Sequence, residues 1–85
     1  MDADGYKIIN TKTAEQSNEL KKLATIATDL GLSSELRSKA VGLIGNIRTH
    51  AALLALLELV ANEHLTKGER ELALKQAEKI IRAIG

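Results

Sequence analysis

The chain has 85 residues and a mass of 9.2 kDa, the size of one domain. It contains no cysteine, which excludes disulfide bridges, thiolate metal sites and a cysteine nucleophile. Its net charge is only +1, and its single aromatic residue excludes the stacking platforms that bind single-stranded nucleic acid. No apolar run is long enough to span a bilayer and no secretory signal opens the sequence, so we expect a cytoplasmic protein without a membrane anchor.

Residues 1–12 are predicted to form an extended arm outside a helical domain that spans residues 13–85. The arm has an acidic, turn-like start and one short apolar stretch, Tyr6–Ile9. No other stretch of the sequence has strand character, so this one has no strand to pair with. We expect the arm to pack across the helices or across a partner chain.

From Thr13 onward the apolar residues recur with the period of an α-helix. Thr13 and Gln16 fit a capping box, and Gly31 is expected to end this first helix in the left-handed conformation. Ser33 or Ser34 is expected to begin the second helix. One face of that helix is predicted to be apolar: Leu36, Ala40, Leu43, Ile44 and Ile47.

Capping residues also mark the third and fourth helices. Thr49 is expected to begin the third, which runs to about Asn62. Thr66 and Glu69 form the best capping box of the chain and begin the fourth, with Gly85 at its C-terminal end.

Because the connections are short, sequential helices are expected to be antiparallel neighbours. The predicted fold class is therefore all-α, with four antiparallel helices arranged as two stacked helical hairpins, residues 13–48 and 49–85.

The two hairpins share an apolar pattern that suggests an internal repeat. A shift of 34 residues superposes the first helix on the third, for example Leu20 on Leu54. A shift of 37 residues superposes the second helix on the fourth, for example Ala40 on Ala77. The second shift is three residues longer than the first, which predicts an insertion in the turn around residues 65–68.

The second helix contains, in order, a hydrophobe–Arg pair, an Ala, a hydrophobe–Gly pair and an Ile. The residues that carry this pattern are Arg37, Ala40, Ile44, Gly45 and Ile47. This pattern resembles the second helix of a HEAT-like repeat, of the short type found in phycobilisome lyase-like proteins. The resemblance covers about residues 18–85. It implies a scaffolding, adaptor or regulatory role in protein binding, and it does not imply lyase activity.

The chain departs from the HEAT-like pattern at several positions. In the fourth helix, Leu74 takes the place of the Arg and Arg82 that of the Gly. Such hairpins often carry an acidic residue in their turn, and Glu35 is the nearest match to it. Proline, which is common in many HEAT repeats, is missing. The fourth helix therefore matches the HEAT-like pattern less well than the second.

The third helix is apolar on almost all sides, and such a helix is normally buried on most of them. Two repeats are also fewer than the three or so that a stable stack needs. Two interpretations stay open: a central core helix, or a helix with one face that closes a homodimer or other homo-oligomer. The predicted interface residues are Leu53, Leu54, Leu56, Leu57 and Val60.

Gly42 and Gly45 lie three residues apart inside the second helix, where each glycine costs about 1 kcal/mol relative to alanine. Either Gly45 lies near a helix end, or both glycines let another backbone approach closely, in the same chain or in a partner.

A candidate basic surface consists of Arg37, Arg48, Lys75, Lys79 and Arg82. It could bind anions or nucleic acid. It could equally be a solvated face on which glutamates pair with the cations four residues later. Proteins that bind duplex DNA usually have a much stronger basic excess than this chain. A nucleic-acid-associated or transcription-related role is therefore the alternative function and not the main prediction.

The sequence contains no recognisable catalytic, cofactor-binding or metal-binding pattern. His50 and His64 are too far apart on one helix to share a metal ion. Asp2 and Asp4 begin like a calcium loop, but the later oxygen ligands are missing. The apolar residues offer no convergent polar groups that would mark a small-molecule carrier. We therefore predict a non-catalytic protein-interaction domain that needs no cofactor or metal.

Overall fold

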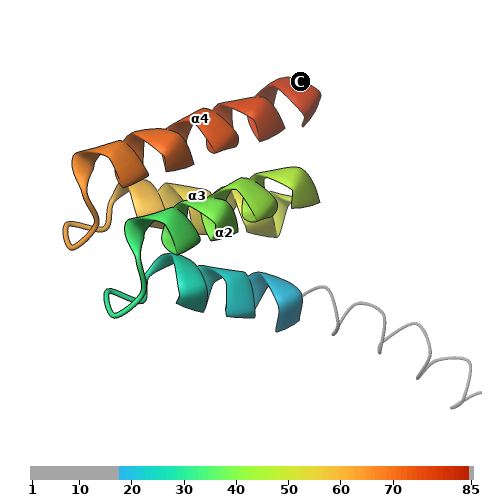
Figure 1. Cartoon of the computed structure of the whole chain (residues 1–85). Coiled ribbons are helices and arrows are strands. Elements are labelled where there is room, and N and C mark those ends of the chain that lie inside the picture. The colour runs from blue at the N-terminus through green and yellow to red at the C-terminus, as the bar shows by residue number, and fades with distance from the viewer. Residues whose placement is uncertain (1–17, 85) are drawn as a thin grey trace, which may run out of the picture.

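The computed structural model describes residues 18–84, and within this range it consists of helices joined by turns, without strands (Figure 1). The first helix includes residues 18–27, and α2 (Ser34–Ile47), α3 (His50–Val60) and α4 (Lys67–Ile84) follow. Successive helices run in opposite directions, so the first helix pairs with α2 and α3 pairs with α4. The predicted all-α fold of two stacked antiparallel hairpins is confirmed. The predicted arm, the capping box at Thr13 and Gly85 lie outside the described residues.

The helices begin at the capping residues that the sequence predicts. The hydroxyl oxygens of Ser33 and Thr49 accept hydrogen bonds from the amides three residues further on, at 3.2 and 3.1 Å. Thr66 and Glu69 form the reciprocal hydrogen bonds of a capping box at the start of α4. Each side chain satisfies a backbone donor that the first turn of a helix leaves free.

Two helix ends differ from the prediction. The first helix ends at residue 27, and Gly31 does not have a positive φ. Instead, the Asp29 side chain accepts a hydrogen bond from the Gly31 amide at 2.9 Å and forms a turn. At the end of α3, Asn62 accepts in the same way from the His64 amide at 2.9 Å, and α3 ends at Val60. Asp and Asn side chains compete with helical hydrogen bonds in this manner, which explains both early ends.

The turns within the two hairpins repeat at an interval of 33 residues, and both lie at the same end of the molecule. Asp29 corresponds to Asn62, and the cap Ser33 corresponds to Thr66, with equivalent hydrogen bonds at each pair. The insertion predicted around residues 65–68 is therefore wrong. The shifts of 34 and 37 residues rest on the apolar pattern alone, and Leu, Ile and Ala are so abundant in this chain that they match at several offsets. We refer to this correspondence as the 33-residue alignment.

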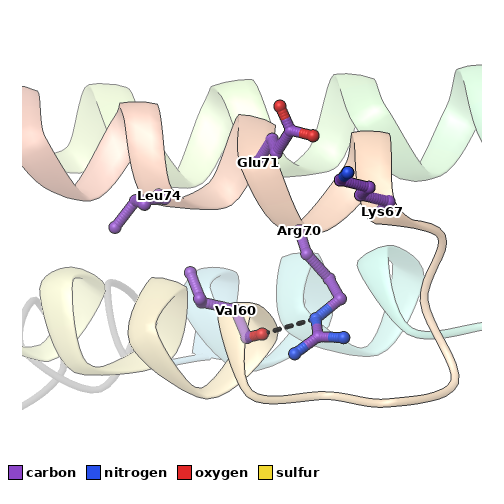
Figure 2. Close-up of a pocket in the computed structure, with 5 residues that line it drawn as sticks. All are labelled: Val60, Lys67, Arg70, Glu71 and Leu74. Carbon is purple, nitrogen blue, oxygen red and sulfur yellow. Dashed lines mark hydrogen bonds between the residues drawn. The ribbon is translucent and has the colours of Figure 1, made fainter.

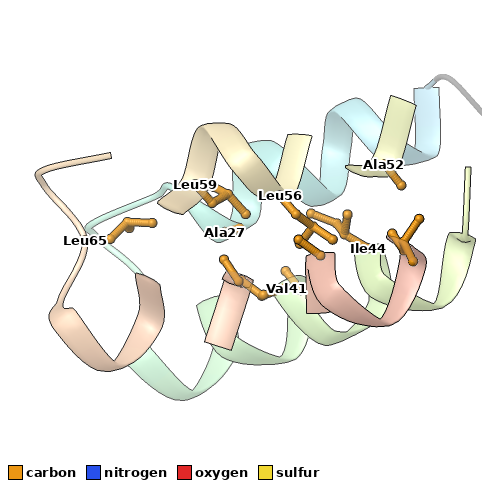
Figure 3. Packing of buried hydrophobic residues seen from close by; sticks show 11 residues of the cluster. Ala27, Val41, Ile44, Ala52, Leu56, Leu59 and Leu65 are labelled. Atoms are coloured by element: carbon orange, nitrogen blue, oxygen red, sulfur yellow. The ribbon is translucent and has the colours of Figure 1, made fainter. Parts of the chain in front are cut away.

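Small side chains make up much of the hydrophobic core, to which all four helices contribute (Figure 3). The core residues are Ala27, Ala40, Val41, Ile44, Ala52, Leu56, Leu59, Leu65, Ala73, Ala77 and Ile80. Alanine at these positions allows the helix axes to approach closely.

Gly45 lies where α2 meets α4, and it permits this close contact. A Cβ atom at Gly45 would lie 2.9 Å from Cβ of Gln76, nearer than packed side chains allow. A Cβ atom at Gly42 would have no heavy atom within 4 Å. A close approach therefore occurs within the chain at Gly45, but it is made by the Gln76 side chain and not by a backbone, and it does not involve Gly42.

Candidate functional site

A buried ion pair joins the two hairpins. Nη2 of Arg37 lies 2.8 Å from Oε2 of Glu69, and Nε of Arg37 donates a hydrogen bond to the same oxygen at 2.9 Å. The Ser34 hydroxyl also donates to this oxygen, at 2.7 Å. The remaining guanidinium nitrogen, Nη1, donates to the backbone carbonyls of Leu32 and Asp29. Because Arg37 is only 8% exposed and Glu69 only 3%, each charge depends on these partners.

Glu69 has two structural roles. Its second oxygen, Oε1, accepts the Thr66 amide at 2.9 Å and completes the capping box. Burial acts to raise the pKa of Glu69, but the hydrogen bonds from the Thr66 amide and the Ser34 hydroxyl, together with the Arg37 guanidinium, hold that pKa below its ordinary value. The sequence predicts the cap. The sequence does not reveal the ion pair between Arg37 and Glu69, because the two residues are 32 positions apart in the chain.

The lowered pKa of Glu69 predicts a loss of stability in acid. A carboxyl group with a lower pKa in the folded state stabilises the fold above its unfolded pKa of about 4.3, and this contribution disappears as the pH falls through the folded pKa. We expect the free energy of unfolding, measured in urea, to fall more steeply below about pH 5 for the natural chain than for Glu69→Gln. Parallel pH curves for the two proteins would contradict this prediction.

The ion pair also corrects the predicted basic surface. Arg37 is buried and neutralised, so it does not belong to that surface. Arg48, Lys75, Lys79 and Arg82 are exposed. Arg48 ends α2 with a φ of 57°, and the other three lie along α4. Within residues 18–84 the Arg37 pair is the only ion pair, so the glutamate–cation pairs predicted along α4 do not form.

The five predicted interface residues of α3 lie in different environments. Leu56 is fully buried in the core, so it cannot belong to an interface, and this part of the prediction is wrong. Leu53 and Val60 are half-buried against the core. Leu54 is 49% exposed and Leu57 40% exposed. These two residues lie on one face of α3, which we call the α3 patch.

Two leucines that the sequence places on the apolar face of α2 are exposed to solvent. Leu36 is 47% exposed and Leu43 is 53% exposed. They are two helical turns apart on one side of α2, with Ile47 one turn further on. Leu36, Leu43 and Ile47 define what we call the α2 face. The last two also line an open groove against the first helix, together with Glu19, Lys22 and Leu23.

A further groove lies between the end of α3 and the start of α4 (Figure 2). Val60 and Leu74 supply its apolar lining, and Lys67, Arg70 and Glu71 its charges. Nε of Arg70 donates a hydrogen bond to the Val60 carbonyl at 2.7 Å. This bond satisfies a carbonyl that the last turn of α3 would otherwise leave free.

The residues considered for metal binding are not brought together. His50 begins α3 and His64 lies in the turn that follows it, and both are exposed. The structure places no three His, Asp or Glu side chains of residues 18–84 close enough together to bind a metal ion. Asp2 and Asp4 lie outside this range. None of the helices in the same range has both the length and the apolar character needed to cross a bilayer.

Comparison of the chain with protein-family models, with curated proteins and with solved structures gave no match. The buried ion pair, the α3 patch and the α2 face are therefore the observations from which its function is inferred.

Proposed function

We propose that this chain is a non-catalytic protein-interaction domain built from two HEAT-like hairpins, that it has an adaptor, scaffold or regulatory role, and that it self-associates. The observation that carries the proposal is the amount of large apolar side chain left at the surface of so small a domain. Among the residues whose side chains the structure describes, eight are large, apolar and between 38% and 57% exposed: Ile26, Leu30, Leu36, Leu43, Leu54, Leu57, Leu74 and Ile81. They include the leucines of the α2 face and of the α3 patch, which in each case share one side of a helix, and contiguous exposed apolar patches mark interaction surfaces.

The division of apolar residues between core and surface supports the same conclusion. Only five leucines or isoleucines lie in the core, where five of the eleven residues are alanines, whereas eight leucines or isoleucines of the described residues are exposed. Full burial of a leucine stabilises a fold by about 1.5–3 kcal/mol, far more than burial of an alanine. A domain that folded without a partner would gain stability by placing its largest apolar side chains inside. The opposite distribution is typical of a surface that a protein partner covers.

The alternative, a nucleic-acid-associated role, has less support. One of its five cations, Arg37, is neutralised by Glu69 inside the domain. The remaining four belong to a chain whose net charge is +1. Phosphate binding relies mainly on an excess of positive charge, which this chain does not have.

Molar mass measured by light scattering behind size exclusion tests self-association. Over a hundredfold range of concentration, we expect the mass to rise to about twice the 9.2 kDa of one chain. The dimer should persist in high salt, because apolar contacts do not weaken there as ion pairs do. A mass of 9.2 kDa at every concentration would contradict self-association and leave the exposed apolar surface to a different protein.

A further inference from the structure

We propose that the α2 face joins two copies of this chain in a symmetric dimer, with the two α2 helices antiparallel. This inference rests on the self-association proposed above, and it names the surface and the geometry. It follows from the 33-residue alignment, from the charges on the opposite end of the stack and from the spacing of the two leucines.

The 33-residue alignment identifies the α2 face as a stacking surface. Leu36 corresponds to Glu69, and Leu43 corresponds to Gln76. Both α4 residues contact α2 within the chain, Glu69 through the ion pair and Gln76 through its packing against Gly45. The same two positions of α2 carry exposed leucines. The first hairpin therefore presents apolar side chains where the second hairpin presents the residues that attach it to its neighbour.

The opposite end of the stack is a poor partner for these leucines. Within the chain, Glu69 and Gln76 contact three residues of α2: Ser34, Arg37 and Gly45. The 33-residue alignment places Lys67, Arg70 and Glu78 at the equivalent positions of α4. A second copy stacked end to end would set its α2 leucines against these three charges and against Leu74, which is 45% exposed and occupies the position equivalent to Val41. It would also have a glutamate in place of the glycine that permits the close contact. Burying unpaired charges in this way opposes association.

The α2 face is complementary to itself. Leu36 and Leu43 are seven residues apart, about 10 Å along the helix. A twofold axis between them places Leu36 of one copy against the partner's Leu43, and the reverse contact forms at the same time. Ile47 and Leu23 extend the apolar area along the groove, and Glu19 and Lys22 remain at its edge.

Matched substitutions separate the α2 face from the α3 patch. Leu43→Glu and Leu54→Glu make the same change at leucines that are 53% and 49% exposed, so both variants should keep the helical circular dichroism of the natural chain. We expect Leu43→Glu to raise the concentration at which half of the dimer dissociates by about a hundredfold or more, because each dimer contains the change twice. Leu54→Glu should leave that concentration within about threefold of the natural value.

The possible outcomes distinguish this inference from the proposed function. If Leu54→Glu dissociates the dimer and Leu43→Glu does not, self-association stands and the α2 face is overturned. If the natural chain is a monomer at every concentration, both proposals of self-association fail together.

Disulfide trapping tests the antiparallel geometry, since the natural chain has no cysteine. Leu36→Cys and Leu43→Cys are prepared separately, one of them with a short tag that identifies the mixed product. On mild oxidation, we expect the mixture to form mainly the mixed disulfide, because only that pair of positions meets across the axis. Dimers that form as readily from either variant alone would overturn the antiparallel arrangement.

Discussion

Glu69→Gln is expected to lower the free energy of unfolding by about 3–5 kcal/mol, a large share of the stability of a small domain. The glutamine can still accept the Thr66 amide, but it cannot neutralise Arg37. Arg37 is almost fully buried and is held by two backbone carbonyls, so it cannot turn outward to water. Urea unfolding followed by far-ultraviolet circular dichroism measures the change and suits a helical chain without tryptophan.

A control variant and a double variant separate the loss of the ion pair from the loss of a charge. Glu63→Gln removes the same charge from an exposed position and should change the free energy by less than about 0.5 kcal/mol. Arg37→Met combined with Glu69→Gln should be more stable than the sum of the single changes predicts, because no unpaired charge remains buried. If Glu69→Gln costs no more than Glu63→Gln, the stability of the domain does not depend on this ion pair.

Gly45→Ala and Gly42→Ala are expected to change stability in opposite directions, although both replace glycine within the same helix. At Gly42 the added methyl meets open space, so the higher helix propensity of alanine should stabilise the fold by up to about 1 kcal/mol. At Gly45 the methyl would lie 2.8 Å from Cδ and 2.9 Å from Cβ of Gln76. The Cβ atom is attached to the backbone of α4 and cannot swing away. We therefore expect a loss of about 1–3 kcal/mol in urea unfolding.

Truncation of Gln76 should restore part of the lost stability. In Gly45→Ala combined with Gln76→Ala, the contact with Cδ of residue 76 is gone, and so is its Oε1 atom, which is buried without a hydrogen-bond partner, while the contact with Cβ remains. The double variant should be more stable than Gly45→Ala alone. Gly45→Ala and Gly42→Ala with effects of the same sign would show that the contact between α2 and α4 is not as close as the structure places it.

Features that depend on near neighbours in the chain could be predicted from the residues alone. Capping by Ser33, Thr49 and Thr66 is a hydrogen bond between residues three apart, so the residue types suffice to predict it. The helical period of the apolar residues and the short connections then led to two antiparallel hairpins. The local prediction failed at Gly31, where a nearer alternative, the Asp29 side chain, closes the turn first.

Which of several similar residues are buried and which are exposed depends on how the helices pack. The sequence placed Arg37 in a basic surface and Leu56 in an interface, and both are buried. It placed Leu36 and Leu43 on one apolar face of α2 together with Ala40 and Ile44, of which only the last two are buried. The reason is that exposure depends on where a second helix crosses the first. That crossing is set by contacts between residues about 30 apart, such as Gly45 with Gln76, which no local pattern contains.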